Sequence, residues 1–291
     1  MTSIRMQTGL GAGEPAFVMY DRLQGKMLLH SVAQSARRAS RAYLDPPAVA
    51  ALWAAGVKAP DDDLFGTTEP LFIESRSTGA QAYVWRRGVT AFLTFRGTDS
   101  ARDVVEDLRV EAVPLLAEDD AETRGVRVHA GVLAQFRSVE PAITRLVSSF
   151  APPCTDLVVA GHSLGAALAT LAGPHYARSE RLRATCHTFG SPRCGNEAFT
   201  RYFARHVADH VRVINERDPV PMLPLRPVWR HAAATCLVLN GVTASSAYRG
   251  DVSLAKRLWM CVPCVVGVCV GCRVQDHSLD VYNTRLDRAH T

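Results

Sequence analysis

A serine stands between two glycines in the stretch VVAGHSLGAALA, which covers residues 158–169. The apolar run 157–160 precedes it, and an alanine-rich stretch follows. A strand, a Gly-x-Ser-x-Gly turn and a helix in this order are typical of a nucleophilic serine, because the small glycines let strand and helix approach closely. Ser163 is therefore the candidate nucleophile. The alternative is a polar residue at a helix N-terminus.

A serine hydroxyl is a poor nucleophile at neutral pH, so it needs a general base, and the base needs a carboxylate to fix its tautomer. In α/β hydrolases the three residues follow the chain order Ser, Asp, His, so an Asp and then a His are sought after Ser163. Asp218 lies in a loop just beyond the strand-like run VRVIN, where ligand sites occur in open α/β sheets. We take Asp218 as the candidate acid. Glu216, close to the strand, and Asp209, expected before the strand begins, are weaker alternatives.

Three histidines follow Asp218 in the sequence. His277 precedes an amphipathic C-terminal helix and is the candidate base. His231 comes just before the strand-like run ATCLVL, and a structural role at a sheet edge is expected for it. His290 is the penultimate residue, where chain ends are commonly frayed.

Strand-like runs alternate with helical patterns along the chain. Helical spacing over 17–43 predicts one or two helices, and three strands follow at 71–74, 82–85 and 89–95. Further strands are expected at 156–160, 184–189 and 211–215, and helices at 131–150, 164–172 and 197–207. This alternation predicts an α/β fold with a mostly parallel central sheet that helices cover on both faces.

Composition limits the class of protein. The 291 residues are 47% hydrophobic and 21% charged, as in ordinary globular proteins. The net charge of +5 is spread along the chain, so a solvated surface is favoured over nucleic-acid binding. The N-terminus lacks the apolar stretch of a signal peptide, and the longest apolar run, 258–272, is too short to span a bilayer. A cytoplasmic or peripheral membrane location is therefore favoured.

Several further motifs occur in a fixed order. They are FRGT at 95–98 with Asp103 and Asp107-Leu108, VHAG at 128–131, GHSLG at 161–165, TFGSPRCGN at 188–196, NERDPVP at 215–221, and Asp276-His277. With them, the chain resembles the fungal-type, or class 3, lipases of the α/β-hydrolase fold over residues 72–282. The resemblance implies hydrolysis of carboxylic esters in lipids by a triad of Ser163, Asp218 and His277, without a metal or another cofactor.

The resemblance also implies an oxyanion hole formed by Thr98 and by the backbone N–H of Leu164. Leu164 begins a helix whose free N–H groups and dipole suit a developing negative charge. Thr98 follows the strand-like run 91–95, and it could equally cap a helix N-terminus. The two roles of Thr98 are compatible.

Two segments depart from the family pattern. The stretch TDSARDVVEDL after FRG is short and charged, and in this it is closest to members that resemble diacylglycerol lipases. The segment at about 241–274 is expected to be an insertion, and residues 1–70 an N-terminal helical region, within one domain of residues 1–291. An esterase for small soluble esters and an inactive lipase-like lipid-binding protein are the alternative functions.

The insertion contains four cysteines, Cys261, Cys264, Cys269 and Cys272, in the run CVPCVVGVCVGC. Zinc ligation, disulfides, a buried packing hairpin and a membrane-dipping or acylated loop are all open for this run, although zinc sites usually separate their two CxxC units more widely. Basic residues flank Trp259 and the apolar run in 256–273, which suits a peripheral membrane contact.

Overall fold

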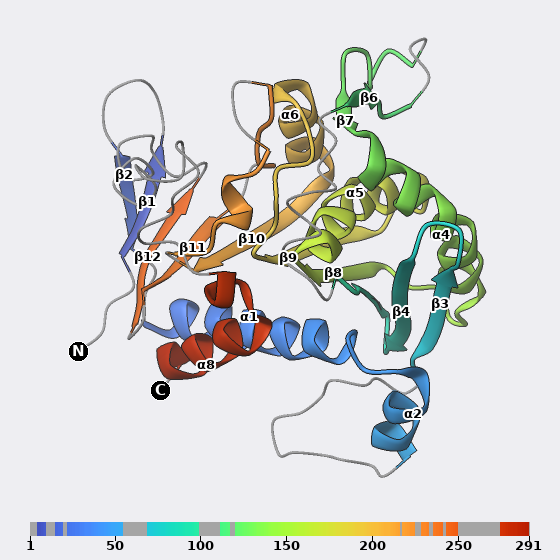
Figure 1. Cartoon of the computed structure of the whole chain (residues 1–291), viewed down its shortest axis with the longest axis horizontal. Helices are drawn as coiled ribbons and strands as arrows, with labels where there is room; N and C mark the ends of the chain where they lie inside the picture. Colours follow the sequence, from blue (N-terminus) through green and yellow to red (C-terminus); the bar gives the residue numbers. More distant parts are fainter. Residues whose placement is uncertain are drawn as a thin grey trace.

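The computed structural model describes residues 5–9, 15–19, 22–54, 69–98, 111–116, 120–215, 217–224, 228–232, 235–240, 243–249 and 274–290. Its centre is a ten-stranded sheet with the order β2-β1-β12-β11-β10-β9-β8-β5-β4-β3 (Figure 1). The strands are β1 (Arg5–Gly9), β2 (Pro15–Met19), β3 (Leu71–Ser75), β4 (Ala80–Arg87), β5 (Thr90–Phe95), β8 (Asp156–His162), β9 (Arg183–Phe189), β10 (Val207–Asn215), β11 (Thr235–Asn240) and β12 (Thr243–Arg249). A separate two-stranded ribbon pairs β6 (Ala112–Pro114) with β7 (Arg127–His129).

The five central strands, β5, β8, β9, β10 and β11, are parallel to one another, and antiparallel pairs lie toward both edges. Parallel strands are buried on both faces, which explains the apolar run 157–160 of β8. Their carboxyl ends therefore meet at one edge of the sheet. Ser163 and Asp218 both follow such ends.

Helices cover both faces of the sheet. Helices α4 (Ala130–Ser149), α5 (Leu164–Ser179) and α6 (Glu197–His206) lie on one face, and α1 (Arg22–Arg41) and α8 (Leu279–His290) pack together on the other (Figure 1). The short helix α2 (Pro46–Ala54) follows α1. The predicted fold class, an α/β hydrolase with a mostly parallel sheet, is confirmed by this arrangement.

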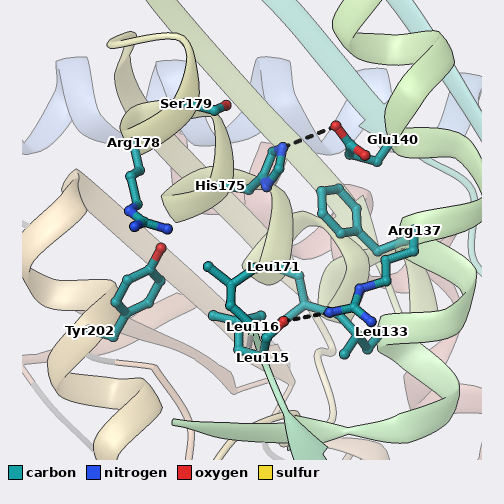
Figure 2. Close-up of a pocket in the computed structure, with 11 residues that line it drawn as sticks. Leu115, Leu116, Leu133, Arg137, Glu140, Leu171, His175, Arg178, Ser179 and Tyr202 are labelled. Atoms are coloured by element: carbon teal, nitrogen blue, oxygen red, sulfur yellow. Dashed lines mark hydrogen bonds and ion pairs between the residues drawn. The ribbon is translucent and has the colours of Figure 1, made fainter. Parts of the chain in front are cut away.

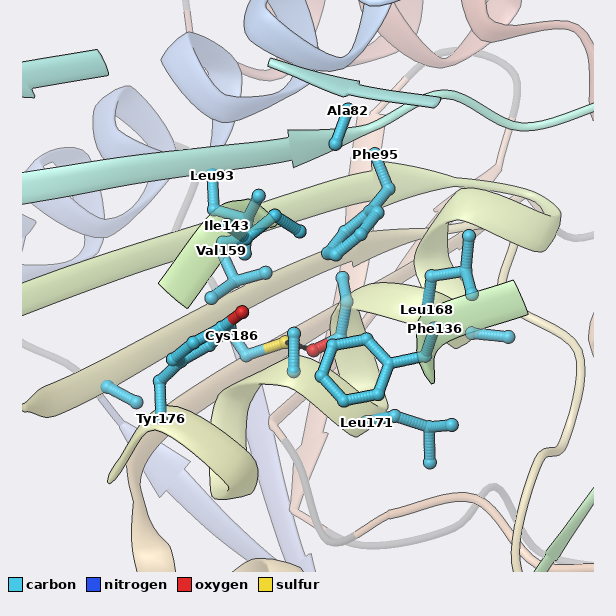
Figure 3. Packing of buried hydrophobic residues seen from close by; sticks show 14 of the residues in the cluster. Ala82, Leu93, Phe95, Phe136, Ile143, Val159, Leu168, Leu171, Tyr176 and Cys186 are labelled. Carbon is cyan, nitrogen blue, oxygen red and sulfur yellow. Dashed lines mark hydrogen bonds between the residues drawn. The ribbon is translucent and has the colours of Figure 1, made fainter. Parts of the chain in front are cut away.

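The larger core lies between the sheet and helices α4, α5 and α6. Leu93, Phe95 and Val159 of the strands meet Phe136 of α4 and Leu168 of α5 there, all at most 3% exposed (Figure 3). Many of the α5 residues are alanines, so this helix packs closely over β8 and β9. Close packing fixes the start of α5 relative to the end of β8.

A second core lies on the opposite face, under α1 and α8. Val32 of α1 and Tyr282 of α8 pack with Val211 and Val213 of β10 and with Leu237 of β11. This core holds the C-terminal helix against the parallel strands. His277, at the end of the short 3-10 helix η3 (Val274–His277), precedes that helix.

Several expected boundaries were wrong. The region 1–70, expected to be helical, contains strands β1 and β2, and residues 17–19 lie in β2, because a short apolar run fits a strand as well as a helix. Residues 220–222 form the 3-10 helix η1, and β12 lies within 241–274, whose assignment as an insertion stays a prediction. Strand β10 begins at Val207, so Asp209 lies inside it rather than before it.

Candidate active site

Ser163 occupies a sharp turn between β8 and α5. Its backbone has φ 57° and ψ −127°, an uncommon conformation for a residue with a side chain. Gly161 and Gly165 allow the turn, because a Cβ on Gly161 would lie 2.2 Å from the Gly165 carbonyl oxygen and one on Gly165 would lie 2.5 Å from the Phe95 carbonyl oxygen. The flanking glycines are therefore required for strand and helix to meet at this serine.

Asp218 and His277 form a buried pair beyond the end of β10. The Nδ1 atom of His277 lies 2.8 Å from Oδ2 of Asp218, and both residues are at most 4% exposed. The other carboxylate oxygen of Asp218 accepts a hydrogen bond from the Val220 N–H at 2.9 Å. Donation from Nδ1–H to the carboxylate leaves Nε2 of His277 as an acceptor, which is the tautomer that a general base requires.

Phe189 and Gly190, at the end of β9, contact both the serine and the Asp218–His277 pair. The Ser163 N–H donates to the Phe189 carbonyl at 3.0 Å, and a Cβ on Gly190 would lie 3.0 Å from the His277 ring. The Ser163 Oγ and the His277 Nε2 atoms are both buried, and neither has a hydrogen-bond partner among the described residues. The structure thus brings Ser163, Asp218 and His277 together.

Tyr282 of α8 holds the carboxylate from a second direction. Its hydroxyl donates to Oδ2 of Asp218 at 2.6 Å and accepts from the Asn215 N–H at 3.0 Å. Burial, and then the negative charge of Asp218, raise the pKa of Tyr282 well above its usual value. The hydroxyl therefore keeps its proton and remains a donor to Asp218.

His162 holds His277 through its backbone. The Nε2 atom of His162 lies 2.6 Å from the carbonyl oxygen of His277, and its Nδ1 lies 2.9 Å from the Tyr43 hydroxyl. A carbonyl only accepts, so His162 donates from Nε2 and accepts from Tyr43 at Nδ1. Burial, and then the charge of His277, hold the pKa of His162 well below its usual value, which keeps this ring neutral.

The candidate oxyanion residues lie on the same edge. Thr98 is half-buried and follows β5 by three residues, and Leu164 is the first residue of α5. A Cβ on Gly97 would lie 3.2 Å from the Cβ of Ser163, so the segment before Thr98 lies directly against the serine turn. N–H groups in the first turn of a helix have no partner within the helix, and this applies to Leu164.

The alternative residues lie elsewhere. His231 is buried, and its Nε2 lies 2.8 Å from the Pro221 carbonyl oxygen rather than near Asp218. Burial, followed by the charges of Arg212 and Arg193, holds the pKa of His231 well below its usual value. Asp209 is exposed in the first half of β10, at the other end of the strand from Asp218.

Some predicted features lie outside the described residues. They are Asp103, Asp107, Leu108, Glu216, the four cysteines at 261–272 and the segment 256–273. Among the described helices, none is both long and apolar enough to cross a membrane. Sequence reasoning missed Tyr43, His162 and Tyr282 as partners of the site. The only available signal was that a buried tyrosine hydroxyl needs a hydrogen-bond partner.

Comparisons with known proteins relate this chain to lipases. The model of the family "Lipase (class 3)" matches residues 92–228. By sequence, this segment is a fungal-type class 3 lipase segment. It includes Thr98, Ser163, Leu164 and Asp218, whereas His277 lies beyond it and is placed at the site by its contacts.

Relatives of the class 3 lipase segment are named lipases. The chain is 34% identical to a lipase of Rhizopus niveus over 143 residues, which are 46% of this chain and 35% of the relative. It is 39% identical over 102 residues to secreted mono- and diacylglycerol lipase 1 of Fusarium solani, over 34% of this chain and 30% of that protein. The matches span about a third of the length of these curated relatives.

A solved triacylglycerol lipase extends the likeness to the whole fold. In that protein, a serine protease triad forms the catalytic centre. It superposes on this class 3 lipase-like chain with a TM-score of 0.58 and 25% identity, over 89% of this chain and 94% of the other. The likeness in fold therefore extends beyond the segment that the family model matches.

Proposed function

We propose that this protein is a serine hydrolase that cleaves carboxylic ester bonds of lipids through an acyl-enzyme on Ser163. The observation that carries the proposal is the pair of His277 and Asp218, joined at 2.8 Å, which leaves the Nε2 of His277 buried and, like the Ser163 Oγ, without a hydrogen-bond partner among the described residues. Relatives named as lipases favour a lipid ester over a small soluble ester. The intact set of three residues argues against an inactive binding protein.

In the first half of the proposed reaction, the Ser163 Oγ attacks the ester carbonyl carbon while the His277 Nε2 takes the hydroxyl proton. The carbonyl oxygen becomes an oxyanion, which the N–H groups of Leu164 and Thr98 stabilise. Collapse of this intermediate breaks the ester bond to the alcohol. His277 then returns its proton to the leaving alcohol, and the acyl group stays on Ser163.

In the second half, a water molecule attacks the acyl-enzyme, with His277 again taking a proton. The new bond joins the water oxygen to the acyl carbon, and the bond to the Ser163 Oγ breaks. The serine recovers its proton from His277, and a carboxylic acid leaves. Asp218 stays ionised throughout and stabilises the imidazolium that forms in each half.

Replacing the nucleophile tests this proposal. Ser163→Ala should lower turnover of a p-nitrophenyl ester on the order of a million-fold, because the triad acts as a unit. A fluorophosphonate probe should label only the parent protein. More than a few per cent of residual activity in the purified variant would assign the reaction to another residue.

The substrate class needs a separate measurement. We expect activity on acylglycerols or phospholipids, and rates should be compared among a short p-nitrophenyl ester, a triacylglycerol emulsion and phospholipid vesicles. Hydrolysis of the short ester alone would favour the small-ester alternative.

We further propose a peripheral membrane contact through residues 256–273. Lys256 and Arg257 precede Trp259 and an apolar run in the sequence, and amphipathic segments of this kind lie in the membrane interface. Replacing 259–272 by a short Gly/Ser linker should leave hydrolysis of a soluble ester intact and lower vesicle binding and vesicle hydrolysis together. Unfolding of this variant, or undiminished pelleting with vesicles, would instead indicate a packing role.

A further inference from the structure

A pocket lies away from the serine, between helices α4, α5 and α6. Its volume is about 450 Å³, within the size range of small-molecule sites. The pocket residues Leu171 and Arg178 follow Leu164 along α5 by seven and fourteen positions, which corresponds to roughly 10 and 20 Å of helix. This pocket is therefore distinct from the candidate active site.

The inner surface of this pocket is apolar. Leu133 of α4, Leu171 of α5 and Tyr202 of α6 line it and are at most 4% exposed (Figure 2). Phe136 of α4, which is 3% exposed, also lines it. The half-buried Leu115 and Leu116, which follow β6, line one side. An alkyl chain placed here would be removed from water, at a gain of about 0.8 kcal/mol per buried CH₂.

The rim of the same pocket carries two arginines. Arg178 is bound to carboxylates, because its guanidinium lies 2.6 Å from Asp120 Oδ2 and 3.1 Å from Glu122 Oε2. Arg137 donates to the Leu115 carbonyl at 2.8 Å and makes no ion pair with a described residue. Its guanidinium thus lies beside the pocket leucines and, among the described residues, takes part in no ion pair (Figure 2).

Among the described residues that line the pocket, Glu140 is the carboxylate, and its Oε1 has two partners. Glu140 Oε1 accepts from the Thr144 hydroxyl at 2.9 Å and lies 3.3 Å from His175 Nε2. Burial, which outweighs the attraction of Glu140, lowers the pKa of His175, so at neutral pH this ring is uncharged. Of the two arginines at the rim, Arg178 is paired with two carboxylates and Arg137 with none among the described residues, so an added anion would bind at Arg137.

We propose that this pocket is a second lipid-binding site that takes a medium-chain fatty-acid carboxylate, with the alkyl chain against Leu133, Leu171 and Leu116 and the carboxylate at Arg137. An apolar inner surface with a guanidinium at the rim that pairs with no described carboxylate matches a ligand with an apolar tail and an anionic head. The ligand class is that of the product of the proposed hydrolysis. The site itself requires no chemistry at Ser163.

Equilibrium dialysis with radiolabelled dodecanoate tests this site, with a dodecyl phosphonate first attached to Ser163 so that binding at the serine is blocked. We expect one dodecanoate per chain, and Arg137→Glu should raise its Kd at least tenfold. Arg145→Glu is the matched control, since Arg145 is an exposed arginine of the same helix outside the pocket lining, and it should leave the Kd within about twofold.

Two further ligands separate the contribution of the carboxylate to binding from that of the alkyl chain. Hexanoate should bind more weakly than dodecanoate because it buries less alkyl surface. The neutral dodecanol should bind with a Kd that Arg137→Glu does not change. Dodecanoate binding that is lost when the phosphonate is attached, or that Arg137→Glu leaves unaltered, would overturn the proposal.

The dialysis experiment distinguishes a failure of the second lipid-binding site from a failure of the proposed hydrolase activity. If the phosphonate failed to label Ser163, the hydrolase assignment would be at fault. Dodecanoate binding that still depends on Arg137 would nevertheless support the second site.

Discussion

His277 is held through both its side chain and its backbone. Asp218 binds its Nδ1, and His162 donates to its carbonyl oxygen from a ring whose centroid lies 4.5 Å from that of His277. A general base must keep its lone pair directed at the nucleophile, and small misplacements lower the rate steeply. Tyr43, His162 and Tyr282 act on the reaction through these contacts, so we regard them as positioning residues.

Tyr282→Phe tests the support of Asp218. The substitution removes the donor to Asp218 Oδ2 and the acceptor of the Asn215 N–H, while the ring stays. Because a hydrogen bond to a charged group contributes about 1.5–3 kcal/mol, we expect kcat/KM for a soluble ester to fall roughly tenfold to a hundredfold. Tyr176→Phe is the control, since it removes a buried hydroxyl of α5 far from the serine. Equal rates in the two variants would contradict the role of Tyr282.

His162→Leu tests the support of the His277 backbone. The variant leaves the His277 carbonyl and the Tyr43 hydroxyl without this imidazole. We expect kcat to fall about tenfold or more with little change in KM, because the substitution displaces the base and leaves the substrate contacts in place. The rate of fluorophosphonate labelling should fall in parallel. A variant that loses thermal stability but labels at the parent rate would show that His162 is only structural.

The turn after β9 is the element that brings serine and histidine together. Gly190 has φ +57°, and a Cβ there would lie 2.9 Å from Asp218 Oδ2 and 3.0 Å from the His277 ring. The conformation alone costs about 1 kcal/mol or more for a residue with a side chain. The added crowding against the catalytic pair is specific to this position.

Gly190→Ala and Gly88→Ala therefore form a matched pair. Gly88 has the same φ of +57°, but a Cβ there would meet nothing within 4 Å. We expect Gly88→Ala to lose the stability that its backbone conformation costs, Gly190→Ala to lose at least as much in urea, and only Gly190→Ala to lose most of its esterase activity. A similar loss of activity in both would mean that the backbone conformation, and not the contact with Asp218 and His277, is responsible.

The sequence predicted local helices, strands and turns better than the contacts between residues that are far apart in the chain. The turn at Ser163, strand β8 and helix α5 follow from the glycines and from the apolar pattern of neighbouring residues. The Tyr43–His162 contact joins residues 119 positions apart, and the His162–His277 contact joins residues 115 positions apart. Such contacts depend on how α1 and η3 pack against the sheet, which local spacing does not encode. Strand β2 was missed because its pairing with β1 decides its conformation.

At the scale of the whole molecule, ten strands form one sheet with a core on each face. The assignment of residues 1–291 to a single domain remains a prediction. Both cores contribute to the site, because α5 carries the residues after Ser163 and α8 carries Tyr282. Substitutions that weaken packing in either core should therefore lower both the free energy of unfolding and the esterase activity.

Buried neutral histidines should make this fold sensitive to acid. Burial, and then the charge of Arg38, lower the pKa of His187 to about 4, and the pKa values of His162 and His231 are also lowered, chiefly by burial. An unfolded histidine titrates near 6.5, so between pH 6.5 and 4 the unfolded state binds more protons than the folded state. The free energy of unfolding should therefore fall as the pH falls through this window, by up to about 3 kcal/mol for His187 alone.

His187→Gln removes one of these titrations. Glutamine keeps a polar side chain near Ser35, whose hydroxyl lies 2.7 Å from the His187 Nδ1. At pH 7 the variant should be no more stable than the parent, because in the parent the ring is neutral and has this partner. In urea unfolding followed by circular dichroism from pH 7 to 4, its free energy of unfolding should decline less steeply than that of the parent. Parallel curves for the two proteins would mean that protonation of His187 contributes nothing to the loss of stability in acid.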